Sequence, residues 1–558
     1  MGNIMSHQNY EGVGVDLPPS HLHDAPGITE FLNIQLEDEG RRVIQRQYLG
    51  ILACQDTFNV ERALRDVREA SERSAHVPPQ VFVVDDSWDN EIAAQIQTSA
   101  ESYGVEYHRV RNSQGIGNAV IDKYCQNLTD ALSPSQRLRN RWLARSILKN
   151  DMDTPLAEPR EGELEIRGGC EGARNFGYLA AIYEAGRDGF SLDDVIVTIN
   201  DDDNRCFTIA GDTTEGIQKE WHDFFSERQA WFSDPITSVV AGRYAGHRGN
   251  PIAAVQDALE ICRRVVSDKT TGALNNYTVL NVAEDAFDVV DSSQAFDILP
   301  EIIDSILMRH PIIGLVTRDD YHKQPVLDWQ HAKINGGSVT LLGSMAAKLP
   351  IPTSGLSDYN FGSLLRSEAL NTGHPNRALR VEQATMHQRR VKEHGGNAGG
   401  SDVLGIFANS EGILQTKLMH VIRGDAGLQK QIISRLNVSE EYFDQLLSDN
   451  QDNASRVQMI QQCLHDITSL SEALPDAEIP SKVSGALQLL ATAFSQKVFD
   501  TAIHSLQDIE PDPNEVIAIK RGILRYLDAY TIWPQLSRAA YDLGRLSSRD
   551  VAPVRATD

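Results

Sequence analysis

The chain has 558 residues, of which 41% are hydrophobic and 23% are charged, and its formal net charge is −26 at pH 7. This is the composition of a globular protein that can bury a sizeable core, and the length suggests roughly two to four domains. The negative balance argues against general nucleic-acid binding and against docking to an anionic membrane, because both need basic faces.

The six cysteines are scattered and form no CxxC pair, so we expect reduced thiols and a cytoplasmic protein. No apolar stretch approaches the length of about 18 residues that a membrane-spanning helix requires, and no signal peptide precedes the first strand. An anionic substrate would therefore need a local correction of charge, either a metal ion or a few well-placed Arg and Lys residues.

Taken in order, the chain begins with a polar arm over residues 1–45 and then alternates between strands and helices. Strands are predicted at 48–53, 81–84 and 105–110, and helices at 60–74 and 90–103. Strands that alternate with helices of this length indicate a parallel, doubly wound sheet. The segment from about 125 to 167 interrupts this rhythm. It is helical and basic in part, and we interpret it as an insertion, either a lid near the site or a surface excursion.

The most informative stretch is a β-branched run, 195–199, that ends in three successive aspartates, Asp201, Asp202 and Asp203. Three like charges at a strand end resist burial, and a hard divalent cation bound by oxygen ligands would compensate them. A solvated acidic turn is the alternative. Asp85 and Asp86 also follow a predicted strand. The carboxyl ends of parallel strands share one edge of a sheet, so both clusters should line one crevice.

A glycine-rich segment, 168–177, precedes a predicted helix at 178–185. Glycines before a helix leave backbone N–H groups free to face an anion. Arg174 lies within this segment and could reach a phosphate or form a surface salt bridge.

These pieces occur in an order that resembles the nucleotide-binding half of GT-A-fold glycosyltransferases, particularly the family-two type and its retaining relatives. The resemblance runs over about residues 46–395 and rests on Asp-Thr-Phe-Asn (56–59), Val-Asp-Asp-Ser (84–87), Gly-Ala-Arg-Asn-Phe-Gly (172–177) and the aspartate triplet. It implies a Rossmann-like α/β catalytic domain at 46–400. It also implies a DxD metal motif at Asp201 and Asp203, with Asp202–Asp203 as another possible register. The donor-binding residues that it implies are Asp56, Phe58, Asp85 or Asp86, Arg174 and Asp202.

The second half of the resemblance concerns the acceptor side. Asp358, in Leu-Ser-Asp-Tyr-Asn-Phe-Gly (356–362), stands where the family places its general base in inverting members. The segment Met-His-Gln-Arg-Arg (386–390) resembles a late histidine motif, which implies His387 as a metal ligand and Arg389 and Arg390 as diphosphate contacts. The usual Glu before the base is missing, so inverting and retaining outcomes both remain open.

Beyond a glycine-dense segment at 394–401, helical apolar spacing predominates over residues 402–558, with helices expected at 428–436, 440–448, 454–474, 481–504 and 515–530. We expect a separate helical domain at 401–558, with packing, dimerisation or acceptor recognition as its possible roles.

The resemblance predicts a glycosyltransferase that depends on Mn²⁺ or Mg²⁺ and moves sugar from a UDP- or GDP-sugar to an acceptor hydroxyl. Two alternatives remain at this level. A nucleotidyltransferase acting on a sugar phosphate would use similar carboxylates, although the first loop lacks the glycine-rich basic form that it normally shows. A non-catalytic nucleotide-binding or scaffold protein would retain the fold without the chemistry.

Overall fold

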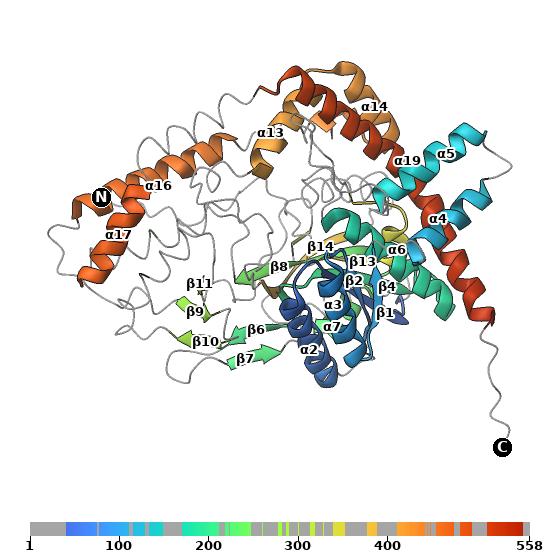
Figure 1. The fold of residues 1–558 in the computed structure, drawn as a ribbon, viewed down its shortest axis with the longest axis horizontal. Helices are drawn as coiled ribbons and strands as arrows, with labels where there is room; N and C mark the ends of the chain where they lie inside the picture. The colour runs from blue at the N-terminus through green and yellow to red at the C-terminus, as the bar shows by residue number, and fades with distance from the viewer. Residues whose placement is uncertain are drawn as a thin grey trace.

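The computed structural model describes the following residues: 41–74, 78–110, 115–128, 133–148, 170–210, 218–221, 224–246, 259, 277–281, 286–289, 300, 313–317, 327–328, 339–351, 377–387, 410–440, 443–444, 447, 453–473, 480–493 and 510–550. Of the arm predicted at 1–45, residues 1–40 lie outside them, and so does most of the helix predicted at 440–448. Figure 1 shows an α/β arrangement in which a central sheet is flanked by helices.

The first half of the sheet consists of four parallel strands. These are β1 (Arg46–Ala53), β2 (Gln80–Asp85), β3 (Glu106–Arg109) and β4 (Val195–Asp201). β1 lies between β2 and β4, and β3 pairs with the outer side of β2. The strands predicted from the sequence are confirmed here. Short β-branched runs between helices are typical of parallel strands that are buried on both faces.

The second half makes the sheet mixed. β13 (Val339–Leu342) runs antiparallel to β4 and to β8 (Thr237–Gly246). β14 (Arg377–His387) then pairs parallel with β8 and antiparallel with β12 (Leu327–Asp328) and β5 (Asn204–Arg205). The described sheet therefore has nine strands, of which β13, between β4 and β8, and also β12 and β5 run antiparallel to their neighbours. The expected parallel sheet is corrected by these strands.

Helices cover both faces of the parallel half, as the alternation in β1 requires. Leu49, Ile51 and Ala53 point to one face, where they join a core with α2 (Thr57–Arg73) and α3 (Asn90–Ser102). Tyr48 and Leu52 point to the other face, where they meet α4 (Ile116–Asn127) and α6 (Cys170–Asp188). A strand buried on both sides is thereby explained by helices on both sides.

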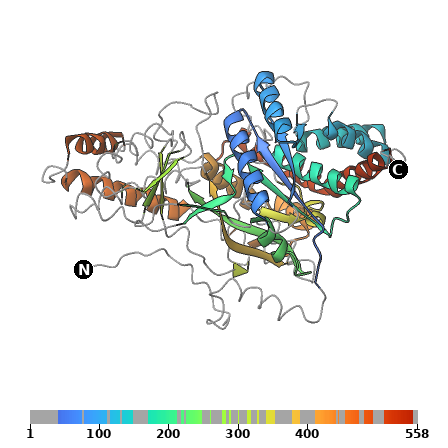
Figure 2. The same ribbon diagram turned by 90° about the horizontal axis from the view of Figure 1, so that it is seen from below.

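The last described helix, α19 (Pro513–Asp550), packs along α6 and closes the larger core (Figures 1 and 2). Trp533 is fully buried there and donates its indole N–H to the Ala346 carbonyl at 2.9 Å. The two helices cross closely because each has a glycine at the contact. A Cβ at Gly186 would lie 2.2 Å from the Tyr541 carbonyl oxygen, and one at Gly544 would lie 2.1 Å from that of Tyr183. Residues of α19 therefore belong to the same core as residues of β1 and α6.

Other helices surround this core. α5 (Pro134–Ile147), within the predicted 125–167 insertion, begins at a capping box formed by Ser133 and Gln136 and packs on α4 and α19. α13 (Ser410–Arg423) and α14 (Ala426–Leu436) form a smaller core with the first half of α19. α16 (Asn453–Ala473) and α17 (Ser481–Ala493) lie at one end of the molecule, away from the sheet (Figures 1 and 2).

The remaining described elements are short. β6 (Phe207–Ala210) pairs with β7 (Gln218–Trp221), while β9 (Tyr277–Asn281) pairs with β10 (Ala286–Val289) and β11 (Ile313–Thr317). α7 (Phe224–Trp231) and α10 (Gly343–Ala346) flank the large sheet. Among the described helices, none is both long and apolar enough to cross a membrane.

Candidate functional site

The candidate site is the edge of the sheet where the four parallel strands end. The register pairs Ala53 with Asp85, Leu52 with Asp201, and Asp85 with Arg109. The last residues of the four strands are therefore aligned, as parallel pairing requires. Two acidic clusters that are more than 110 residues apart in the chain, 85–86 and 201–203, come to the same edge. Their meeting at one edge was predicted from the sequence, and the strand register confirms it.

Asp85 and Asp86 have different surroundings. The Asp85 carboxylate is fully buried and accepts hydrogen bonds from the Ser87 N–H at 2.8 Å and from the Tyr107 hydroxyl at 2.6 Å. Burial, together with this carboxylate, raises the pKa of Tyr107 above its ordinary range, so Tyr107 is a stable donor at neutral pH. Asp85 thus fixes the loop after β2. Asp86, which is 5% exposed, follows at the tip of the strand and donates its N–H to the Ala53 carbonyl.

Hydrogen bonds also hold the loop after β1. Gln55 adopts a left-handed backbone conformation, with φ of 59°, and its N–H donates to the Ser87 hydroxyl at 2.8 Å. A non-glycine residue in this conformation costs free energy and is often found at functional sites. Asp56 then caps α2, because its two carboxylate oxygens accept from the Asn59 N–H and side-chain amide, both at 3.0 Å. Phe58, in the first turn of α2, lies under the Arg62 guanidinium at 5.5 Å.

The aspartate triplet forms the turn between β4 and β5. Asp201 is the last residue of β4, Asp202 is buried, and Asp203 is half-buried. Arg174, only 4% exposed, donates to the Asp201 carboxylate at 2.6 Å. The salt bridge that Arg174 forms is therefore not at the surface of the helix, as one of the two expectations had it. Arg174 lies near the start of α6, which begins at Cys170, so Gly172 and Gly177 belong to the helix and do not form the loop before it that the sequence suggested.

A buried ion pair between β5 and α2 holds the turn that contains the aspartate triplet. Arg205 of β5 and Asp66 of α2 are 0% and 2% exposed, and Arg205 donates to both carboxylate oxygens of Asp66 through Nε and Nη2. Such a bidentate pair fixes orientation as well as distance. Because Arg205 is only two residues from Asp203, the ion pair holds the end of the acidic turn against α2.

The register also brings His387 to this turn. β14 pairs with β5 so that His387 lies opposite Asn204, the residue after Asp203. The end of β14 is aligned with the end of β8 as well, through His387 and Gly246. The backbone of His387 is therefore adjacent to the aspartate triplet. Asp358, Arg389 and Arg390 lie outside the described residues.

Several residues of this edge carry no sequence signal of their own. Tyr107, Gln55, Asp66 and Arg205 are recognised only when the strands are aligned, because their partners are distant in the chain. Trp88 is different. It directly follows the Asp-Asp-Ser segment and leaves 49% of its surface exposed, which is unusual for so large an apolar side chain. Its position two residues after Asp86 is a signal that sequence reasoning could have used.

A second polar cluster is formed by side chains of β3 and α6. Ligand atoms of Glu106, His108 and Glu184 lie within 4.8 Å of one another, a spacing that a metal ion could bridge. Arg187 already lies among them, paired with Glu184 and 3.4 Å from Glu106. Burial raises the pKa of Glu184 to about 8 and lowers the pKa of His108. Since a guanidinium supplies the positive charge, we interpret this cluster as a structural one.

The chemistry of the first edge suits a hard cation. The carboxylates of the triplet offer oxygen ligands only, which suits Mg²⁺ or Mn²⁺. Such ions keep some positions for substrate phosphates, and Arg174 supplies a further positive charge at the same turn. Within the triplet, Asp201 is paired with Arg174, Asp202 is buried and Asp203 is half-buried.

No protein-family model and no curated protein sequence matches this chain. Among solved structures, the fold is weakly similar to the mannosyltransferase PcManGT from Pyrobaculum calidifontis, solved in complex with GDP-Man and Mn²⁺. The alignment covers 89% of this chain and 93% of the other, with 10% sequence identity and a TM-score of 0.32.

Proposed function

We propose that the protein is a glycosyltransferase of the GT-A type, which uses a divalent cation and a nucleoside-diphosphate sugar. The observation that carries the proposal is the alignment of the strand ends that bear Asp86 and the triplet Asp201–Asp203 at one edge of the sheet. In open α/β sheets, ligands bind at the carboxyl ends of the strands. An edge that combines acidic residues with a buried arginine can bind a phosphate-bearing ligand through a metal.

Asp203 and His387 would hold Mn²⁺ or Mg²⁺ against the donor diphosphate, with Asp201 or Asp202 as a further ligand. The ion, when bound, acts as a Lewis acid that stabilises the charge on the leaving diphosphate. Arg174 orients Asp201 through their 2.6 Å ion pair and adds positive charge beside the turn. The pairing of His387 opposite Asn204 supports its assignment to this site.

The nucleoside would lie across the ends of β1 and β2. Asp86 is the better candidate for its contact than Asp85, since both oxygens of Asp85 are engaged by Ser87 and Tyr107. Asp56 caps α2 through Asn59, so its role is to position the first turn of this helix, which presents Phe58. Trp88 adds an exposed aromatic face on which a base can stack.

On the acceptor side the proposal retains Asp358 as the residue that accepts the proton of the acceptor hydroxyl, if transfer inverts, and Arg389 with Arg390 as diphosphate contacts. A carboxylate acts as a general base from about 3 Å. The donor base, the acceptor and the stereochemical outcome would follow from product analysis.

In this proposal the protein acts in the cytoplasm, and the helices beyond 401 provide the surface for any self-association.

The test is metal-dependent nucleotide binding. Titration of UDP and GDP in calorimetry, with and without Mn²⁺, should show binding of one nucleotide that requires the ion. Asp203→Asn should retain the fold and weaken that binding by at least about 100-fold, because loss of even an outer-shell partner of a metal costs 10–100-fold. Asp193→Asn is the matched control, since Asp193 is exposed at the opposite end of β4.

A donor screen completes the test. Incubation with nucleotide sugars should release nucleoside diphosphate. Release of pyrophosphate instead would identify a nucleotidyltransferase, and absence of binding to any nucleotide with Mn²⁺ would leave a non-catalytic protein.

A further inference from the structure

The outer face of α5 combines exposed apolar side chains with arginines. This helix carries four arginines and no acidic residue over Pro134–Ile147. Leu138 and Trp142 are 70% and 43% exposed, although large apolar side chains at the surface of a helix are usually covered. They are four residues apart and therefore lie one turn from each other on the same side.

The spacing along α5 separates two opposite faces. Leu143, Ala144 and Ile147 are buried and pack into the main core. At 100° per residue, Leu138 lies almost opposite the centre of that buried face, so its exposure is a consequence of where the helix is held. A hollow of about 500 Å³ lies at the outer face of α5 and is lined by Ser135, Leu138, Arg139, Arg141, Trp142 and Arg145.

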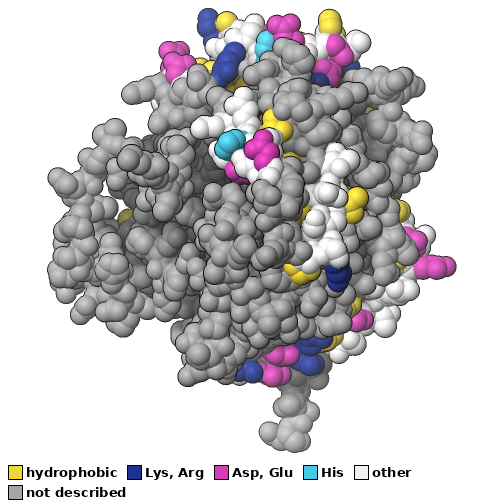
Figure 3. Space-filling model, turned by 90° about the vertical axis from the view of Figure 1, so that its left-hand side faces the viewer, with side chains coloured by type: hydrophobic (Ala, Val, Ile, Leu, Met, Phe, Trp, Pro, Cys, Tyr) yellow, Lys and Arg dark blue, Asp and Glu magenta, His cyan; other side chains and the backbone are white. Residues whose placement is uncertain are grey.

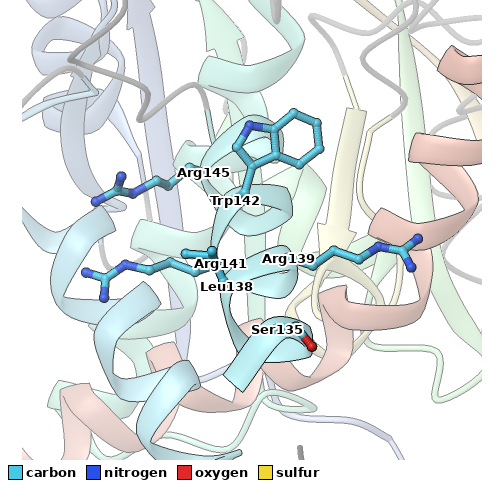
Figure 4. Close-up of a pocket in the computed structure, with 6 residues that line it drawn as sticks. All are labelled: Ser135, Leu138, Arg139, Arg141, Trp142 and Arg145. Atoms are coloured by element: carbon cyan, nitrogen blue, oxygen red, sulfur yellow. The ribbon is translucent and has the colours of Figure 1, made fainter. Parts of the chain in front are cut away.

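The arginines flank the apolar pair on both sides. In Figure 4, Arg141 and Arg145 extend to one side of the helix and Arg139 to the other, with Leu138 and Trp142 between them. The Arg525 guanidinium of α19 adds a fourth positive charge, 4.9 Å from the centre of the Trp142 ring. Such an order, apolar in the middle and cationic at both edges, is typical of helices that lie in a membrane interface.

Acidic side chains of the described residues balance this charge only in part. Asp528 pairs with Arg139 and Asp122 pairs with Arg141, each at 2.6 Å. Among the described residues, two carboxylates therefore pair with arginines at a face that has four guanidinium groups, in a chain whose formal net charge is −26. On the face shown in Figure 3, by contrast, the described acidic and basic side chains are interspersed. The total charge does not describe the local field at α5.

We propose that this face of α5 docks the protein reversibly onto an anionic phospholipid bilayer. Leu138 and Trp142 enter the headgroup–acyl boundary, and Arg139, Arg141 and Arg145 reach lipid phosphates on either side, as long cationic side chains do at such a boundary. A tryptophan with one apolar body and one N–H donor suits that depth. A soluble polyanion would engage the arginines but would gain nothing from the exposed leucine, and for that reason the bilayer is the partner that the face fits.

The docking combines two weak contributions. A pair of apolar side chains gives little membrane affinity alone, and attraction between arginines and anionic lipid is screened by salt. Binding should therefore need both, and it should be lost in neutral vesicles and at high ionic strength. This view replaces the expectation, drawn from total charge, that the protein avoids anionic membranes.

The experiment is sedimentation of the full chain with vesicles. Wild-type protein should bind vesicles that contain 30 mol% phosphatidylglycerol in phosphatidylcholine, and not vesicles of phosphatidylcholine alone. The double variant Leu138→Glu/Trp142→Glu should reduce binding at least tenfold, and Arg141→Gln/Arg145→Gln should do the same. Leu489→Glu is the matched control, because Leu489 is 59% exposed on α17 with no arginine on its helix, and it should bind like wild type.

A second measurement identifies the residue that enters the bilayer. Acyl-chain bromination should quench part of the tryptophan fluorescence of the wild type, and Trp142→Phe should remove that part while vesicle binding persists. Equal binding by wild type and the Leu138/Trp142 variant would overturn the proposal. Retention on an anionic polysaccharide together with no sedimentation with vesicles would also overturn it, and would identify the face as a polyanion site.

Discussion

Arg205 and Asp66, 139 residues apart in the chain, form an ion pair in which neither side chain is more than 2% exposed. The pair joins β5, directly after the acidic turn, to α2, directly after the first loop of the site. Both parts of the candidate site are therefore fixed by one contact.

Asp66→Ala should destabilise the fold by about 3–5 kcal/mol, because it leaves a buried guanidinium without its carboxylate. Urea unfolding of the two proteins measures this difference. The comparison variant is Asp542→Ala, which removes the partner of the exposed Arg538 on α19 and should cost less than about 1 kcal/mol. Similar losses in the two variants would show that the buried pair has no special role.

Trp88→Ala should weaken nucleotide binding by roughly 5- to 150-fold, which corresponds to the 1–3 kcal/mol of one base–aromatic stack. Stability should change little, since half of the side chain is already exposed. Trp88→Phe retains an aromatic face and should recover most of the affinity. If both variants bind Mn²⁺ and nucleotide as the wild type does, Trp88 does not contact the base.

Glu184→Gln should change how stability depends on pH. The pKa of Glu184 is raised to about 8 in the folded state, first by burial and then by Glu106, from an ordinary value of 4.5. A raised pKa means that the folded state holds the proton more tightly, so this contribution to stability is full below pH 4.5 and is lost as pH rises through 8.

The melting temperature of the wild type should accordingly fall more between pH 5 and pH 9 than that of Glu184→Gln. The exposed Glu472 provides the control, and Glu472→Gln should follow the wild-type profile. Identical profiles for wild type and Glu184→Gln would mean that Arg187 keeps the carboxylate ionised throughout.

Trp533→Ala should cost about 3–5 kcal/mol, the usual range for removal of a fully buried aromatic side chain. The loss should appear in the unfolding of the whole α/β core, because Trp533 belongs to the same cluster as β1, β4 and α6. Hydrogen exchange in β4 reports on this directly. If Trp533→Ala loosened α19 alone and left β4 protected, the result would favour the predicted boundary at 401.

The sequence was most informative where local pattern and burial coincide. The strands at β1, β2, β3 and β4 and the helices α2 and α3 were predicted within a few residues, since alternation and β-branched runs report burial directly. The meeting of Asp86 with the triplet could be predicted because parallel strands share one edge.

Other features depend on contacts that no local pattern encodes. The antiparallel β13 was not predicted, because its partners β4 and β8 are set by chain topology and not by its own four residues. The capping role of Asp56 and the hydrogen bond from Tyr107 to Asp85 depend on side-chain geometry. The packing of α19 on α6 was missed because helical periodicity shows which face is apolar, and does not show what covers it.

The close crossing of α6 and α19 has a consequence for biosynthesis. Tyr183 and Ser547, which share a 3.0 Å hydrogen bond beside the two glycines, are 364 residues apart. At translation rates of 5–20 residues per second, α6 waits roughly 20–70 seconds on the ribosome before its partner emerges. During that interval the apolar side of a nascent α/β sheet is uncovered, so chaperone binding should concentrate on chains that have been synthesised past β4 but not yet to α19.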